Sequence, residues 1–98
     1  MAHHEHDVDI EVPEGWTVTD DGKMIEIEIE TEDFIEAVDL FNELAEIAED
    51  QMHHPDFHIE EYNQVRITSW SHDIGGLSDR DEELASSITD VLRKRDLV

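Results

Sequence analysis

The chain has 98 residues and no cysteine, which is enough for one compact domain and excludes disulfide bonds and thiolate chemistry. Its 28 Asp and Glu residues against 6 Lys and Arg give a formal net charge of -22, which would repel nucleic acid and anionic membrane surfaces. Because the acidic residues are spread through every segment and no apolar run approaches the ~20 residues that span a bilayer, we expect a cytoplasmic protein from a salt-accumulating halophile.

The first part of the chain predicts a leader and two strands. Residues 1–12 are polar and contain three histidines, and we expect a flexible acidic leader there, followed by a single domain over residues 13–98. A short strand is predicted over residues 16–19, and a turn then leads into a second strand over residues 24–31. Isoleucine and glutamate alternate strictly in this second strand, which is typical of a half-buried strand with a wet carboxylate face.

A long amphipathic helix is predicted from Thr31 to about His53. Thr31 is a favourable N-cap, and the acidic residues that follow it suit the positive end of a helix. Apolar residues then recur at three- and four-residue spacing along one face, whereas the opposite face is acidic. Pro55 cannot continue the helix, so the chain must turn directly after His53 and His54.

The remainder predicts two more strands and a second helix. Residues 57–61 and 64–73 have the pattern of strands, and Gly75 and Gly76 end the second of them. Ser78 is a favourable N-cap for the final helix, whose basic residues suit its negative C-terminal end. This order predicts an α+β fold, in which a four-stranded antiparallel sheet carries both helices on one face.

Strict alternation in the fourth strand places a third histidine in a polar and aromatic row. Val65 and Ile67 would point to one face of the sheet. The opposite row would contain Arg66, Thr68, Trp70 and His72. His72 could then approach His53 and His54, and a cluster of imidazoles suits proton transfer or metal binding better than it suits a core.

Several of these residues form one spaced pattern: an acid, His-His-Pro four residues later, then an aromatic residue, a histidine and an aspartate. The positions are Glu49, His53, His54, Pro55, Tyr62, His72 and Asp81. Gly15-Trp16 upstream and Gly76-Leu77-Ser78 downstream add to the pattern. From about residue 13 to its end, the chain resembles the pterin-4a-carbinolamine dehydratase family, and the resemblance implies the same α+β fold that periodicity predicts.

The resemblance implies an activity and a set of site residues. Members of this family convert 4a-hydroxytetrahydropterin to quinonoid dihydropterin and water during tetrahydropterin recycling. By resemblance, His53, His54 and His72 are the acid–base residues, with the acid and the base left unassigned. No metal or cofactor is implied, since the pterin is the substrate, and the family tends to form homodimers or homotetramers.

Three further residues are candidates for substrate binding, each with a structural alternative. Glu49 lies one helical turn before His53 and could orient it or bind a pterin amino group, but it could also be one more solvated acid. Asp81 lies three residues after Ser78, where capping the helix is as good an explanation as catalysis. Trp16 could stack on the flat pterin or fill the core.

Two other classes of function stay open from the sequence alone. One is a metal-binding module in which His53, His54, His58 and His72 hold zinc, although adjacent histidines splay apart and the usual ligand spacings are absent. The other is a non-catalytic protein that binds pterin or self-associates through a free sheet face.

Overall fold

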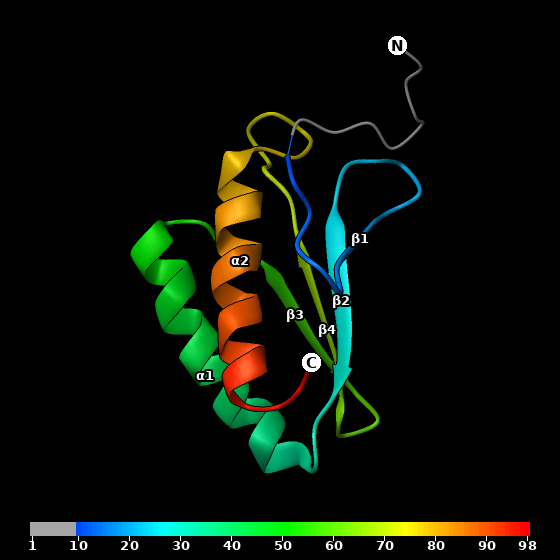
Figure 1. Cartoon of the computed structure of the whole chain (residues 1–98), viewed down its shortest axis with the longest axis vertical. Helices are drawn as coiled ribbons and strands as arrows, with labels where there is room; N and C mark the ends of the chain where they lie inside the picture. The colour runs from blue at the N-terminus through cyan, green and yellow to red at the C-terminus, as the bar shows by residue number, and fades with distance from the viewer. Residues whose placement is uncertain (1–9) are drawn as a thin grey trace.

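The computed structural model describes residues 10–98, and it has the predicted order of elements. The elements are β1 (Thr17–Val18), β2 (Ile25–Glu30), α1 (Phe34–Gln51), β3 (Asp56–Glu60), β4 (Gln64–Ser69) and α2 (Asp79–Lys94). All neighbouring strands pair antiparallel in the order β1-β2-β4-β3. Figure 1 shows both helices against the same face of this sheet, so the predicted fold class is confirmed.

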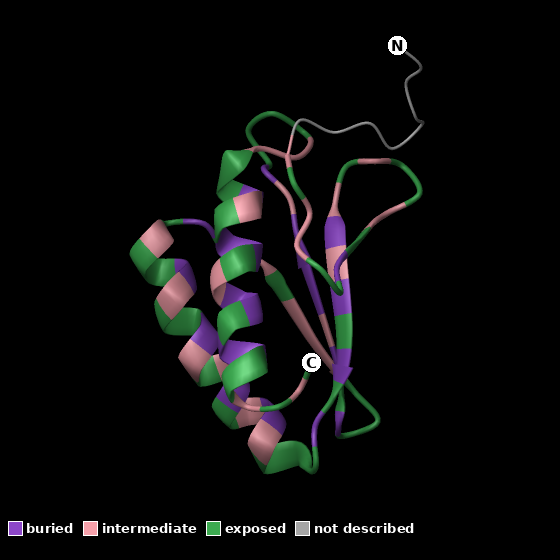
Figure 2. Cartoon of the chain, in the orientation of Figure 1, coloured by how far each residue is buried: buried purple, intermediate pink, exposed green. Residues whose placement is uncertain are grey.

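The core lies between the sheet and the two helices. The isoleucines of β2 are buried, and their partners on β4, Val65 and Ile67, are buried as well. Leucine, isoleucine and alanine side chains of α1 and α2 complete this core. Figure 2 shows the buried residues on the sides of the helices that face the sheet, as amphipathic periodicity requires. The glutamates of β2 alternate outward, leaving Glu28 and Glu30 exposed.

The first helix begins later than predicted. Its N-cap is Asp33, whose side-chain oxygen accepts a hydrogen bond from the Glu36 backbone N–H at 2.8 Å. Thr31 is buried instead, and its backbone N–H donates to the Asn63 carbonyl at 2.9 Å, which ties it to the β3–β4 turn. The expectation that Thr31 caps the helix was therefore wrong, because the sheet holds this residue first.

The helix and the fourth strand also end earlier than predicted. Helix α1 stops at Gln51, and Met52 takes a left-handed backbone conformation with φ 53°. Strand β4 stops at Ser69 rather than at residue 73, although an isolated bridge between Ser71 and Gly76 continues the pairing. His53 therefore lies outside the helix, and His72 lies in a loop.

The leader predicted over residues 1–12 falls mostly outside the described residues, which begin at Ile10. Of its last residues, Val12 packs against the core, and the Glu11 backbone N–H donates to a Glu82 carboxylate oxygen at 3.1 Å. Within residues 10–98, no helix has the length and apolar character that crossing a membrane requires.

Candidate active site

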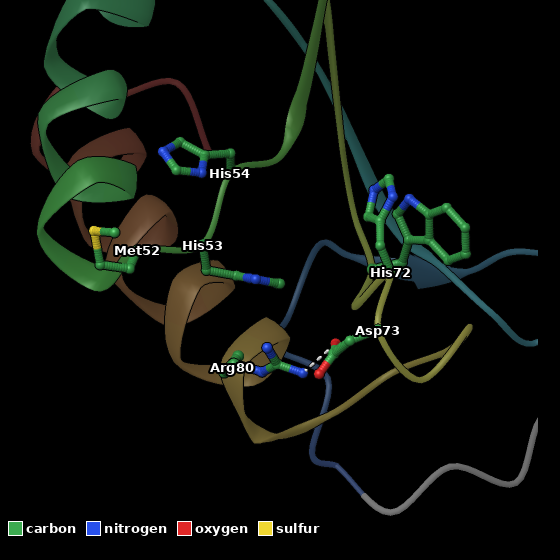
Figure 3. Close-up of a pocket in the computed structure, with 7 residues that line it drawn as sticks. Met52, His53, His54, His72, Asp73 and Arg80 are labelled. Atoms are coloured by element: carbon green, nitrogen blue, oxygen red, sulfur yellow. Dashed lines mark hydrogen bonds and ion pairs between the residues drawn. The ribbon is translucent and has the colours of Figure 1, made fainter.

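A pocket of about 460 Å³ lies where the end of α1, the loop after β4 and the start of α2 come together. Figure 3 shows histidines entering it from two sides, two from the segment after α1 and one from the loop after β4. The lining residues are Met52, His53, His54, Trp70, His72, Asp73 and Arg80. The structure thus brings together the three histidines that the sequence singled out.

The end of α1 turns two adjacent histidines in different directions. The left-handed Met52 ends the helix, and the His53 backbone N–H returns to the Ala48 carbonyl at 3.1 Å. His53 is consequently buried, with 7% of its surface exposed, whereas His54 is exposed. Pro55 then leads directly into β3, so neither histidine belongs to a regular element.

A buried carboxylate holds His53. Asp81 is fully buried, and its Oδ1 accepts hydrogen bonds from His53 Nε2 at 2.7 Å and Ser69 Oγ at 2.6 Å. Its Oδ2 accepts from Ser71 Oγ at 2.8 Å and from the Ser78 backbone N–H at 3.0 Å. Burial alone would raise the pKa of Asp81, but these hydrogen bonds outweigh it and hold the pKa below its usual value. Asp81 is therefore ionised at neutral pH.

Asp81 also completes the N-terminal cap of α2. The Ser78 side chain accepts from the first turn of the helix, and Asp81 accepts from the Ser78 backbone, which makes a capping box. The sequence left capping and a site role as alternatives for Asp81. In the structure the Asp81 carboxylate both caps α2 and holds His53. It is buried and does not itself line the pocket.

Glu49 bonds to a different histidine from the one expected. Its carboxylate accepts from His54 Nε2, and both side chains are exposed. The prediction that Glu49 orients His53 assumed that the helix continues to His53, but the left-handed Met52 turns His53 inward, away from the surface on which Glu49 lies. Figure 3 shows the His54 ring turned toward α1, which carries Glu49.

The third histidine comes from the loop after β4. His72 is exposed, and its ring contacts the indole of Trp70, with ring centroids 4.2 Å apart and planes at 41°. The predicted alternation is confirmed here, because Ser69 and Ser71 point to Asp81 while Trp70 and His72 line the pocket. From residue 69 to residue 72, side chains therefore alternate between contact with the buried Asp81 carboxylate and the wall of the pocket.

An ion pair closes one side of the pocket. Arg80 Nη2 donates to Asp73 Oδ1 at 2.6 Å, and this guanidinium holds the pKa of Asp73 below its usual value. Sequence reasoning did not assign either residue to the site. Arg80 could have been singled out from the sequence by its position. A cation in the first turn of a helix interacts unfavourably with the helix dipole, which suggests that the residue is there for another contact.

Trp16 lies in the core rather than in the pocket. Only 6% of its surface is exposed, and its indole N–H donates to Thr89 Oγ1 of α2 at 2.8 Å. The sequence left open whether Trp16 stacks on a flat ligand or fills the core, and its burial under α2 leaves the indole no free face at this pocket. Of the two alternatives from the sequence, the structure places it as core.

This placement predicts what Trp16→Phe does. The buried Thr89 hydroxyl would lose its indole partner and a small cavity would form, so the free energy of unfolding should fall by about 1–3 kcal/mol. The Michaelis constant for any pterin turned over should stay unchanged. Thermal unfolding and steady-state kinetics on one preparation test both statements, and a raised Michaelis constant at unchanged stability would contradict the core placement.

Among residues 10–98, no three His, Cys, Asp or Glu side chains gather in a geometry that could hold a metal ion. The zinc alternative needed His58 beside the other histidines, but His58 lies on β3 opposite Arg66 and does not line the pocket.

The sequence profile of the pterin 4 alpha carbinolamine dehydratase family matches residues 1–91. The chain belongs to this family. It is 36% identical to a mitochondrial pterin-4-alpha-carbinolamine dehydratase of Arabidopsis thaliana, over 83% of this chain and 47% of that protein, so it spans about half of that relative. A relative from Trichormus variabilis is 40% identical, over 79% of this chain and 80% of its own length.

A solved structure supports the same fold. The crystal structure of a transcriptional coactivator/pterin dehydratase from Brucella melitensis superposes with a TM-score of 0.73 at 27% sequence identity. The match covers 80% of this chain and 82% of the other. The family match therefore agrees with the resemblance drawn from the spaced pattern.

Proposed function

We propose that this protein dehydrates 4a-hydroxytetrahydropterin to quinonoid dihydropterin and water by histidine acid–base catalysis, in tetrahydropterin recycling. Family membership supports the reaction class. The observation that carries the mechanism is a pocket lined by His53, His54 and His72, with the first of them held by a buried, ionised carboxylate. Its volume of about 460 Å³ suits a two-ring heterocycle.

The reaction needs one proton delivered and one removed. The bond from carbon 4a to its hydroxyl oxygen breaks, and an acid protonates that oxygen so that it leaves as water. A base takes the proton from ring nitrogen 5, and the electron pair of that N–H bond forms the new double bond to carbon 4a. The proton count balances, and no oxidant or reductant is consumed. Positioned imidazoles can perform both transfers near neutral pH.

The hydrogen bonds of His53 suit it to act as the base. An ionised carboxylate can only accept hydrogen bonds, so in the neutral imidazole the Nε2 that faces Asp81 carries the hydrogen. Nδ1 is then the nitrogen with a free lone pair. We assign proton removal to His53 and proton delivery to the opposite wall of the pocket, where His72 lies.

The test is dehydration of chemically generated 4a-hydroxytetrahydropterin, followed by absorbance in molar salt. We expect the native protein to accelerate the reaction, and we expect His72→Ala to lower that acceleration by about 100-fold, with His54→Ala also losing activity. His58→Ala is the matched control, because it removes a histidine on β3 outside the pocket and should leave the rate unchanged.

Circular dichroism of each variant must show that it is folded. A folded native protein that gives no acceleration would overturn the dehydratase assignment and leave a pterin-binding protein as the alternative. Equal losses in His58→Ala and His72→Ala would overturn the assignment of the pocket. The expected homo-oligomer and the cytoplasmic location stay predictions.

A further inference from the structure

The three pocket histidines are held in three different ways. His53 bonds to the buried Asp81, and His54 bonds to the exposed Glu49. Among residues 10–98, His72 has no side-chain hydrogen-bond partner, and the aromatic contact that its ring makes is with Trp70. An exposed imidazole with no fixed contact would sample several rotamers, so the indole is the group that restrains it.

The backbone explains why Trp70 can do this. The bridge between Ser71 and Gly76 continues the strand pairing as far as Ser71, directly before a turn over residues 72–75, and Ser71 is fixed by its hydrogen bond to Asp81. Side chains two apart on an extended chain share a face, so Trp70 and His72 must lie together. The pair is therefore anchored to the same buried carboxylate that holds His53.

We propose that Trp70 is a positioning residue, which holds the His72 imidazole at the angle needed for proton transfer. The inference rests on the proposed function, and it concerns a residue outside the spaced pattern that identified the family. Trp70 is half-buried in the pocket wall, and its indole meets the His72 ring at 4.2 Å between centroids. The indole thus acts through His72 and does not itself move a proton.

An aromatic contact suits this role better than a hydrogen bond. A carboxylate or carbonyl partner would engage one ring nitrogen of His72, whereas contact with the indole engages the ring face. Both nitrogens then stay available to the substrate. The ion pair between Arg80 and Asp73 adds restraint, because Asp73 follows His72 directly in the chain.

The kinetic test compares Trp70→Ala and Trp70→Phe with the native protein. We expect Trp70→Ala to lower kcat by about tenfold with the Michaelis constant within about twofold, since the substrate still binds but His72 is misaligned. Trp70→Phe keeps an aromatic face and should recover most of kcat. Phe34→Ala is the control, because it removes a half-exposed aromatic side chain at the far end of α1.

A double-mutant cycle shows whether Trp70 acts through His72. In a His72→Ala background, Trp70→Ala should cause little further loss of kcat. Independent losses that multiply would overturn the proposal, as would an unchanged kcat in Trp70→Ala. A raised Michaelis constant at unchanged kcat would instead make Trp70 a binding residue, which also overturns positioning.

Nuclear magnetic resonance separates this inference from the proposed function. The indole ring current should displace the His72 ring-proton signals, and Trp70→Ala should return them to the position of a free histidine while the His54 signals stay in place. This readout does not require turnover. If the native protein proves inactive but the His72 signals move as expected, the dehydratase proposal fails and the restraint of His72 stands; unmoved signals overturn the restraint.

Discussion

Asp81→Asn should lower kcat by about 1,000-fold and the free energy of unfolding by about 1–3 kcal/mol. The reason lies in which atoms surround the carboxylate. The Ser78 backbone N–H can only donate, so the amide oxygen of the variant must face Ser78 and Ser71. The amide nitrogen then faces His53 and Ser69 and must donate to them.

That exchange reverses the histidine tautomer. With a donor facing Nε2, the neutral His53 ring carries its hydrogen on Nδ1 and loses the free lone pair there. The base would be gone although the shape of the site is kept. Nitrogen chemical shifts of the His53 ring would report the tautomer directly. A variant with the native tautomer and native kcat would overturn both the assignment of the base and the role of Asp81.

The matched control is Asp79→Asn, which neutralises an exposed aspartate in the same first turn of α2. It removes a similar favourable interaction with the helix dipole but touches neither His53 nor the buried serines. We expect normal kcat and a loss of stability below about 1 kcal/mol. An equal loss of activity in the two variants would attribute the effect to helix capping rather than to His53.

The stability difference between the native protein and Asp81→Asn should depend on pH. The pKa of Asp81 is lowered by folding, so its contribution is complete above the unfolded value, near about pH 4, and is lost as the pH falls through the folded value. The difference in unfolding free energy should therefore be constant near neutral pH and shrink below about pH 4. Denaturant unfolding at several pH values measures it.

The fold was predictable because its signals are local. Alternating isoleucines marked β2, a three- and four-residue apolar period marked α1, and Pro55 required a turn after it. The error at Thr31 arose because its hydrogen-bond partner, Asn63, lies 32 residues away in the β3–β4 turn, and the residue types next to Thr31 give no sign of that bond. Long-range hydrogen bonds decided that boundary.

The site was predictable in membership but not in pairing. The spaced pattern identified the three histidines and Asp81, yet it could not show that Asp81 holds His53 while Glu49 holds His54. That pairing depends on the left-handed backbone conformation of Met52. Methionine rarely adopts this conformation, so its presence in the sequence does not predict the turn. The sequence could not decide between stacking and core for Trp16 for a related reason, since its hydrogen-bond partner Thr89 is 73 residues away.

The melting temperature should rise by about 10 °C or more from dilute buffer to about 2 M potassium chloride. The chain carries a net charge of -22 on 98 residues. In dilute buffer, where the Debye length reaches about 30 Å, its acidic side chains repel one another across the whole domain. Exposed acids such as Glu28 and Glu30 stand side by side on β2 with no basic residue within ion-pair distance among residues 10–98. Screening relieves this repulsion in the folded state.

Screening of ion pairs by salt lowers the stability of the folded state, but the chain has far fewer ion pairs than repelling acidic residues. Salt also screens the pairs of Arg80 with Asp73 and of Arg95 with Glu43, which weakens them. Six cations cannot offset 28 acids, so relief of repulsion dominates. Most of the gain should appear below about 0.5 M salt, since the Debye length has already fallen to about 10 Å at 0.1 M. Any later gain belongs to general salt effects on apolar burial.

A charge-reduced variant separates these two contributions. Asp39→Asn, Glu46→Gln and Asp50→Asn together neutralise exposed acids of α1 that make no side-chain hydrogen bond or ion pair among residues 10–98. This variant should melt higher than the native protein in dilute buffer and at nearly the same temperature in molar salt. Equal melting of the native protein at both salt levels would contradict self-repulsion as the main cause of salt dependence, and with it the expectation that this acidic surface is adapted to a salt-rich cell.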